Sequence, residues 1–264
     1  MSKFWGASVI EIKDMISYKF EVFIWGILNP IMLGVYYYLW HSIYTFSGQT
    51  SIRGFTFGEL ISYYALTLIV SVITWTNVDQ LLAGKVRDGT LVNNLLRPLH
   101  VFTYHLYKKI GGTAFTFVGQ ALPLVVISIL FINLRITSLP NLLLFIISVV
   151  LAMLLTFAFS FLVGLSSFWL IKYAGVRMIR SGTVWFLGGN IVPLAFFPEA
   201  WQKISNFLPF QYMSYSPIQI FLGRYDLYGS LWVIAAQLIW LVILFVLVFS
   251  GWKVALKQFS AVGQ

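Results

Sequence analysis

The chain has no cysteine, and only 9% of its 264 residues carry a charge. The lack of cysteine excludes disulfides, thiolate metal sites and a cysteine nucleophile. A soluble domain carries about 25% charged residues, whereas this chain is 59% hydrophobic with a mean hydropathy of +0.87. The composition therefore indicates an integral membrane protein.

Acidic and basic side chains are missing from all six apolar segments described below. Ion-coupled transporters and pumps need intramembrane carboxylates or histidines, so a secondary transporter is disfavoured, although sodium sites built from backbone carbonyls stay possible. The histidines, His41, His100 and His105, include no i, i+4 pair that would indicate a metallohydrolase. Gly84-Lys85 has Asp79 where a phosphate loop needs its first glycine. We therefore expect no metal or nucleotide on this chain, and any energy for transport must come from a partner.

The apolar segments are long enough to be transmembrane helices, since a crossing needs about 20 apolar residues. The sequence predicts an all-α fold with a single transmembrane domain over residues 1–264 and six spans, at Val22–Trp40, Leu60–Asn77, Gly112–Asn133, Leu142–Ile171, Ser181–Phe197 and Ser230–Ser250. The fourth is longer than a perpendicular crossing, so it must tilt, project from the bilayer or bend, and a bend is expected at Gly164. Pro30 and Pro123 lie inside spans, where neighbouring helices can satisfy the freed carbonyls.

The distribution of lysine and arginine predicts the orientation. With the N-terminus inside, 13 of the 17 cations lie in cytoplasmic segments and four lie outside. The outside four are Arg53, Arg135, Lys203 and Arg224. We expect both termini in the cytoplasm of a prokaryotic cell, and we attribute the net charge of +9 to topology and attraction to anionic lipid, not to nucleic acid.

Two further segments are expected to be helical without crossing. Residues 1–19 place Trp5, Val9, Ile12 and Ile16 on one helical stripe, which predicts a helix lying in the cytoplasmic interface. Residues 198–226 include the uncharged run Ile204–Gly223, which also allows a seventh crossing. Because that run contains two prolines, and because a seventh crossing would put Lys253 and Lys257 outside, we prefer a re-entrant pair of short helices on the outer side.

Two groups of neutral polar residues within the spans have two interpretations. Asn29-Pro30 in the first span and Gly188-Gly189-Asn190 in the fifth loosen two helices and place amides at mid-depth. They are either kinks with a satisfied amide or part of a translocation path, together with Trp75 and Trp185. In the second case we expect the two segments to face each other across the path.

The basic segment 78–111 between the second and third spans has an ordered pattern of helix breaks. A helix that begins near Asp79 can end at Gly89, where a left-handed C-cap is possible. Thr90 can start a second helix through Leu95, with Pro98 after its end. Leucine anchors with a charged rim suit docking into a groove on a soluble protein. The alternative is a loop that only sets the topology.

RDGTLVNNLLRPL in this segment resembles the loop of a type-2 ABC exporter permease, of the family with a GxL…LLRP stretch there. LPFQYMSYSPIQIFLG, before the last span, resembles the outer re-entrant region of that family, and the order of elements matches along the whole chain. The resemblance implies a permease dimer, homodimeric or paralogous, that is driven by cytosolic ATPase subunits carrying ATP and magnesium. It makes the loop a coupling helix with ATPase-coupling residues Asp79, Lys85, Arg87, Asp88, Gly89, Leu91, Leu95, Leu96, Arg97 and Pro98.

The sequence is compatible with three functional classes. The first is the permease subunit of an ABC exporter. The second is an ATP-independent channel or facilitator. The third, a lipid-modifying membrane enzyme, lacks an acid/base cluster. Because the spans offer aromatic rings and neutral amides without fixed charge, the expected cargo is an amphiphile and not a small inorganic ion.

Overall fold

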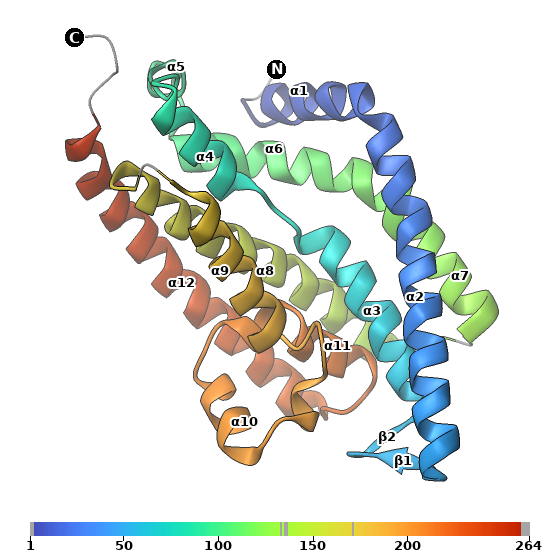
Figure 1. Cartoon of the computed structure of the whole chain (residues 1–264). Helices are drawn as coiled ribbons and strands as arrows, with labels where there is room; N and C mark the ends of the chain where they lie inside the picture. Colours follow the sequence, from blue (N-terminus) through green and yellow to red (C-terminus); the bar gives the residue numbers. More distant parts are fainter. Residues whose placement is uncertain (1–2, 133, 135–136, 171, 260–264) are drawn as a thin grey trace.

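The computed structural model describes residues 3–132, 134, 137–170 and 172–259, and it is almost entirely helical (Figure 1). The α-helices are α1 (Lys3–Ser17), α2 (Lys19–Ser47), α3 (Phe57–Thr74), α4 (Val78–Arg87), α5 (Val92–Leu95), α6 (Val101–Thr116), α7 (Leu122–Ile132), α8 (Leu139–Gly164), α9 (Ala174–Leu187), α10 (Glu199–Asn206), α11 (Tyr215–Phe221) and α12 (Leu227–Gln258). The shorter elements are the strands β1 (Ser51–Ile52) and β2 (Phe55–Thr56), a π-helical turn at Phe117–Ala121 and 3-10 turns at Leu165–Phe168, Leu194–Phe196 and Phe210–Met213.

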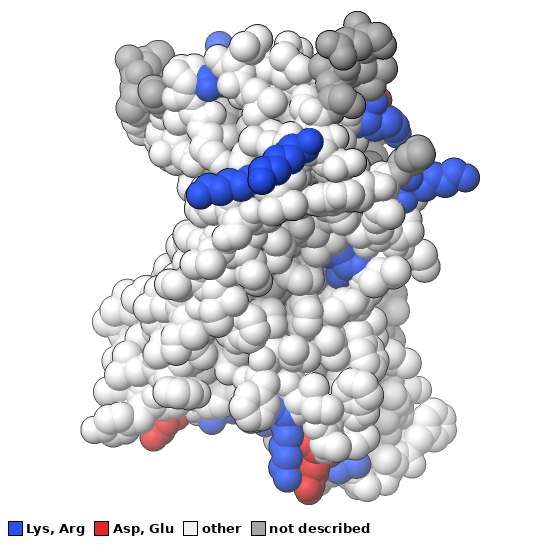
Figure 2. All heavy atoms as spheres, turned by 90° about the vertical axis from the view of Figure 1, so that its left-hand side faces the viewer, with Lys and Arg blue, Asp and Glu red and all other residues white. Residues whose placement is uncertain are grey.

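Within the described residues, five helical segments are long and apolar enough to cross a membrane: Lys19–Ser47, Phe57–Arg87, Val101–Ile132, Leu139–Phe168 and Leu227–Gln258. The segments that contain α3 and α8 are the most buried and form the centre, with α2 and α12 on opposite sides (Figure 1). On the face in Figure 2, charged side chains gather towards the two ends and leave a broad band that is almost free of charge. This is the surface expected of a protein that lies in hydrocarbon.

The fifth expected span differs from the prediction, so the count of six spans stays a prediction. The helix there, α9, begins at Ala174 and ends at Leu187, well before Phe197. Gly189 has a φ of +78°, which turns the chain out of the helix. The Tyr63 hydroxyl donates to the Gly189 carbonyl at 2.7 Å, and the Tyr215 amide donates to the Gly188 carbonyl at 3.1 Å. Contacts with α3 and α11 therefore satisfy the end of a helix that stops inside the bundle.

Two of the long segments are interrupted. The fourth changes from α-helix to 3-10 helix after Gly164, which is where a bend was expected. In the third, the π-helical turn Phe117–Ala121 precedes Pro123 and separates α6 from α7. Because proline has no N–H to donate to the preceding turn, a widened turn is a natural place to lose that hydrogen bond.

The remaining predictions concern the two ends of the molecule. The helix expected within residues 1–19 is α1, which packs along α6, although its place in the membrane interface stays a prediction. Residues 204–223 form no single long helix; α10 ends at Asn206, and the buried α11 packs against α8. The small hairpin β1–β2 was not predicted. Arg224 fixes it, with its guanidinium 3.7 Å from the centre of the Phe55 ring and a hydrogen bond of 2.7 Å to the Gly54 carbonyl.

Candidate functional site

The loop between α3 and α6 forms two short helices joined by a glycine turn. Residues 75–77 leave the helix after α3, and α4 then runs to Arg87. Gly89 has a φ of +69°, so the left-handed conformation expected there is confirmed. The second helix, α5, is a single turn. In Figure 1 this loop lies at the same end of the molecule as α1 and the C-terminal end of α12.

A chain of hydrogen bonds that runs from the partly buried Lys85 to the buried Asn94 and His105 holds α5 in place. The Lys85 ammonium donates to Asn94 Oδ1 at 2.8 Å, and Asn94 Nδ2 lies 3.1 Å from His105 Nε2. Because an ammonium can only donate, it fixes the orientation of the amide, so Nδ2 donates to an unprotonated Nε2. Lys85 therefore stabilises the loop from within. Sequence reasoning missed Asn94, which lies in the middle of the quoted loop motif but has no unusual spacing.

Only some of the expected leucine anchors are available to a partner. Leu96 and Leu95 are 79% and 39% exposed, whereas Leu91 is completely buried within the chain. The side chain of Leu91 already belongs to the core of this protein, so it is not exposed for a partner here, and its role as an anchor stays a prediction. Leu91 supports the loop, and the exposed leucines remain as candidate contacts.

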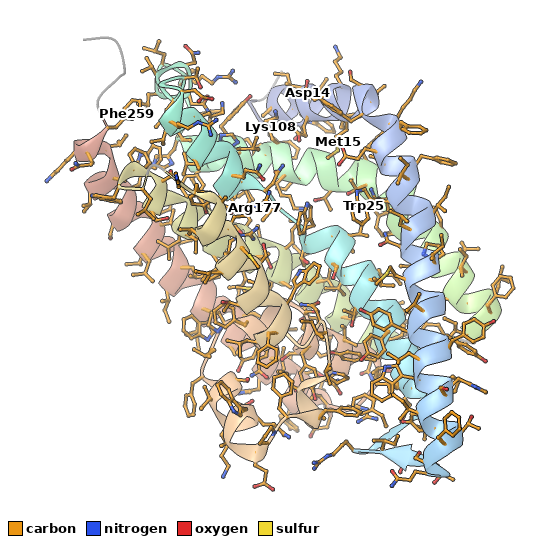
Figure 3. The ribbon with its side chains drawn as sticks, in the orientation of Figure 1. Asp14, Met15, Trp25, Lys108, Arg177 and Phe259 are labelled. Atoms are coloured by element: carbon orange, nitrogen blue, oxygen red, sulfur yellow. The ribbon has the colours of Figure 1, made fainter. Side chains whose placement is uncertain are left out.

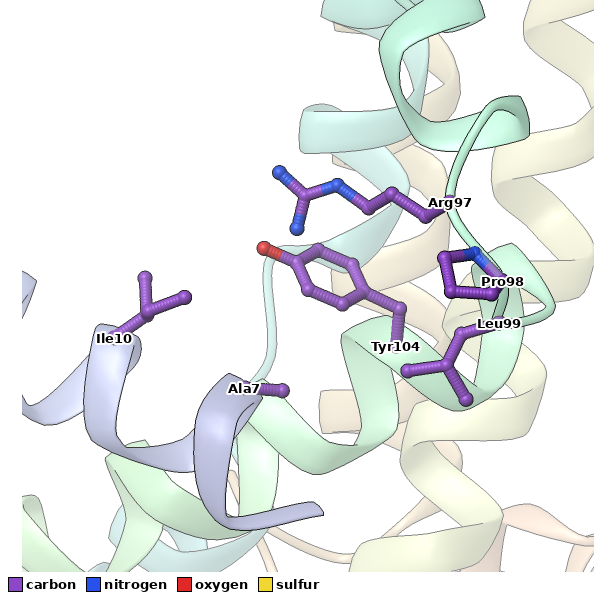
Figure 4. Close-up of a pocket in the computed structure, with 6 residues that line it drawn as sticks. All are labelled: Ala7, Ile10, Arg97, Pro98, Leu99 and Tyr104. Atoms are coloured by element: carbon purple, nitrogen blue, oxygen red, sulfur yellow. The ribbon is translucent and has the colours of Figure 1, made fainter. Parts of the chain in front are cut away.

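The charged residues at the rim of the loop, Arg87, Asp88 and Arg97, are exposed. Arg87 and Asp88 form an ion pair of 3.0 Å on the surface. The Arg97 guanidinium lies 4.3 Å from the centre of the Tyr104 ring, and Tyr104 belongs to α6. Arg97 and Tyr104 line an open hollow between the loop and α1, together with Ala7, Ile10, Pro98 and Leu99 (Figure 4). The rim is thus an accessible surface with apolar walls and an arginine at its edge.

Asp79 was expected on the exposed surface of the loop, but it lies in the interior of the protein. Its side chain is completely buried, and its Oδ2 accepts a hydrogen bond of 3.0 Å from the Tyr173 hydroxyl and lies 3.0 Å from Arg180 Nε. Arg180 Nη1 donates to Ser160 Oγ at 2.9 Å. Burial and the neighbouring carboxylate raise the pKa of Tyr173, so this hydroxyl keeps its proton and donates. Asp79 therefore joins α4 to α8 and α9 inside the protein.

A narrow polar hollow of about 40 Å³ adjoins this ion pair. It is lined by Ser71, Thr74, Trp75, Thr76, Thr156, Arg180, Ser181, Val184, Trp185, Asn190, Met213 and Ser214. It therefore brings together three residues of the expected path, Trp75, Trp185 and Asn190. It has room for only a few water molecules, so one chain alone does not enclose a cargo there.

Asn29 and Pro30 are not among the described residues that line this hollow. Asn29 is buried in α2, which packs against α3, α7 and the π-helical turn. The expected facing of the two amides is thus not found in the hollow. Asn190 makes internal hydrogen bonds, accepting from Ser214 Oγ at 2.8 Å and donating to the Val184 carbonyl at 3.3 Å, so its amide closes the end of α9. A role of Asn29 and Pro30 in a path stays a prediction.

The sequence shows Arg180 only as one more cation on the positive side, because nothing along the sequence relates it to Asp79. Among the described residues, no three histidine or acidic side chains gather closely enough to hold a metal ion.

A family model described as "ABC-2 family transporter protein" matches residues 30–263. The chain belongs to this family. The resemblance seen in the loop and in the outer region is therefore confirmed, and the protein is the membrane-spanning permease component of an ABC transporter. The match begins at Pro30 and thus leaves α1 and the first part of α2 of the permease outside it. No curated protein matches the chain.

Proposed function

We propose that this permease works as an exporter subunit in a dimer and that separate cytosolic ATPase subunits, which bind ATP and magnesium, drive it. The observation that carries the proposal is the loop α4–α5. It is built around the Lys85–Asn94–His105 chain of hydrogen bonds and yet leaves Leu96 largely exposed. An ordered loop that presents a leucine to water has the form of a docking element.

The charges favour the cytoplasmic side for this loop. The exposed Arg87 and Arg97, with Lys108 and Lys109 in the following helix α6, give the positive side that is expected inside. Because α1, α5 and the C-terminal end of α12 lie at one end of the molecule (Figure 1), the same argument favours a cytoplasmic position for both termini and an outer position for the β1–β2 hairpin.

A second permease would complete the path. Much of α9 is uncovered, including Met178, Ile179, Trp185 and Phe186, which are all exposed. Trp185 also borders the polar hollow, so a partner permease packed on this face would enclose that hollow. The partner is either a second copy or a different permease. The mixture of indole rings, hydroxyls and a neutralised arginine favours an amphiphilic cargo.

The deciding experiment is purification of the permease from its native membrane in mild detergent. We expect an ATPase with a phosphate loop to be retained, and we expect export from proteoliposomes to require hydrolysable ATP. Export that continues with a non-hydrolysable analogue would instead establish an ATP-independent facilitator, and uphill export of a small inorganic ion would contradict the proposed cargo.

A further inference from the structure

The buried ion pair between Asp79 and Arg180 joins the loop helix α4 to α9, two elements about 100 residues apart in the sequence. Asp79 is completely buried and Arg180 is 6% exposed. A second contact lies one turn away, where Arg177 Nη1 donates to Gln80 Oε1 at 2.7 Å. Arg177 on α9 is labelled in Figure 3 beside α4. Two consecutive residues at the start of α4 are therefore held by two residues on one face of α9.

The backbone of α4 also lies very close to α8. A Cβ atom on Gly164 would be 2.9 Å from the Asp79 Cα, which is a distance that only glycine permits. In the same region the Tyr173 hydroxyl donates to Asp79 Oδ2, the Ser160 hydroxyl accepts from Arg180 Nη1, and Asp79 Oδ1 is buried without a hydrogen-bond partner among the described residues. Asp79 is thus enclosed by α8, α9 and the segment between them.

The connection of α4 to α3 is much weaker. Residues 75–77 are not helical and separate the two helices. The Trp75 amide donates the last hydrogen bond of α3, to the Ser71 carbonyl, and the Asn77 carbonyl accepts the first one of α4, from Leu81. The chain can therefore change direction between these two residues without breaking either helix. The contacts of α4 with α8 and α9, in contrast, involve a buried ion pair, and removing one member leaves an uncompensated buried charge.

We propose that Asp79 and Arg180 are a rigid joint that carries movement of α4 to α9, while the 75–77 segment absorbs the change relative to α3. This inference rests on the proposed function for the origin of the movement. Arg180, Trp185 and Asn190 border the polar hollow, so a displacement of α9 changes the shape of that hollow. Asp79 is in this view a positioning residue, and it does not contact the ATPase.

Distances between spin labels test the joint. Leu81 on α4, Met178 on α9 and Tyr38 on α2 are exposed, and the chain has no cysteine that would be labelled by accident. The permease is labelled as the pairs Leu81→Cys/Met178→Cys and Leu81→Cys/Tyr38→Cys in lipid nanodiscs, and each distance distribution is measured by pulsed electron paramagnetic resonance.

The first measurement uses the permease alone. We expect a narrow distribution between α4 and α9, which broadens in Asp79→Asn and in the double variant Asp79→Asn/Arg180→Gln. The double variant leaves no unpaired buried charge, so the distance can still be measured in it if the single variant fails to insert. Asp88→Asn removes the same charge from the exposed end of the loop and should leave the distribution narrow. A narrow distribution in the double variant would overturn the proposal.

The second measurement adds the partner ATPase with and without ATP. We expect the α4–α2 distance to shift between the two states and the α4–α9 distance to stay constant. A change in the α4–α9 distance would overturn the rigid joint. If no ATPase binds to the unaltered permease, the proposed function fails, whereas the first measurement still decides whether Asp79 and Arg180 hold α4 to α9.

Discussion

The Lys108 ammonium lies 2.7 Å from the Glu11 carboxylate and ties the start of the third segment to α1. Asp14, one turn further along α1, is 3.2 Å from the same ammonium (Figure 3). The Ser8 hydroxyl adds a hydrogen bond of 3.1 Å to the Tyr107 carbonyl. The N-terminal helix is therefore attached to α6 by specific polar contacts and does not depend on lipid alone for its position.

Replacing this ammonium should loosen α1. We expect Lys108→Met to weaken the docking of α1 by about 0.2–1 kcal/mol, the usual range for partly exposed ion pairs. The check is limited proteolysis of the N-terminal segment in nanodiscs at low and high salt. The unaltered protein should lose protection as salt screens the pair, and the variant should be cleaved faster and respond less to salt. Equal cleavage rates would show that apolar contacts alone hold α1.

A side chain at position 111 should push α6 away from α1. A Cβ atom there would lie 2.7 Å from the Ser8 carbonyl oxygen and 2.8 Å from its Cα, and backbone atoms cannot move aside. We expect Gly111→Ala to cost about 1–3 kcal/mol, as overpacking does, and to lower the thermal midpoint in detergent. The control is Gly6→Ala on α1, where nothing lies within 4 Å; it should not lower the midpoint.

The two kinds of leucine in the loop should behave differently. Leu96→Asp places a charge on the exposed surface, so we expect the permease to fold normally and to retain less ATPase on purification. Leu91→Ala empties a buried site, so we expect a loss of about 2–5 kcal/mol in the free energy of unfolding. Thermal midpoints and ATPase retention, measured side by side, separate the two. Full retention of ATPase by Leu96→Asp would remove this leucine from the docking surface.

His100 should make stability depend on pH. Its Nδ1 accepts the Phe102 amide at 3.2 Å at the start of α6, and its ring lies against Phe249 and Trp252. Partial burial lowers the pKa of His100, so the folded protein favours the neutral ring. The stabilisation is then complete above the unfolded pKa of about 6.5 and is lost as the pH falls towards the lower folded pKa.

Because the ring is partly exposed, we expect protonation of His100 to lower the free energy of unfolding by no more than a weak helix cap contributes, about 0.5 kcal/mol. The measurement compares thermal midpoints between pH 5 and pH 8, as rough limits around that pKa, for the unaltered protein and His100→Asn. The asparagine keeps an acceptor for the Phe102 amide without titrating, so it should reduce the pH dependence. The remaining dependence is expected from the buried His105, whose Nε2 must stay unprotonated to accept from Asn94. The exposed His41→Asn serves as the control. An unchanged slope in His100→Asn would exclude this histidine as the cause.

The sequence predicts much of the architecture, because a bilayer imposes length and hydrophobicity on each crossing. It also predicts the turn at Gly89, since a helix that ends before a glycine follows a local rule. It does not predict that α9 ends at Leu187, because that end depends on Tyr63 and Tyr215 from other helices. Asp79 and Arg180 were both visible as charges, but only tertiary packing pairs them, and Leu91 and Leu96 cannot be told apart by composition.

The π-helical turn at Phe117–Ala121 determines which side of the third segment faces each of its neighbours. A widened turn accommodates one extra residue, which rotates everything after it by about 100° relative to an uninterrupted α-helix. The side of α6 that meets α1 is thus not continued along α7, which instead packs against α2 and α3. Deleting a single residue here would restore a regular helix and turn the buried face of α7, which carries Leu124 and Ser128, away from its neighbours.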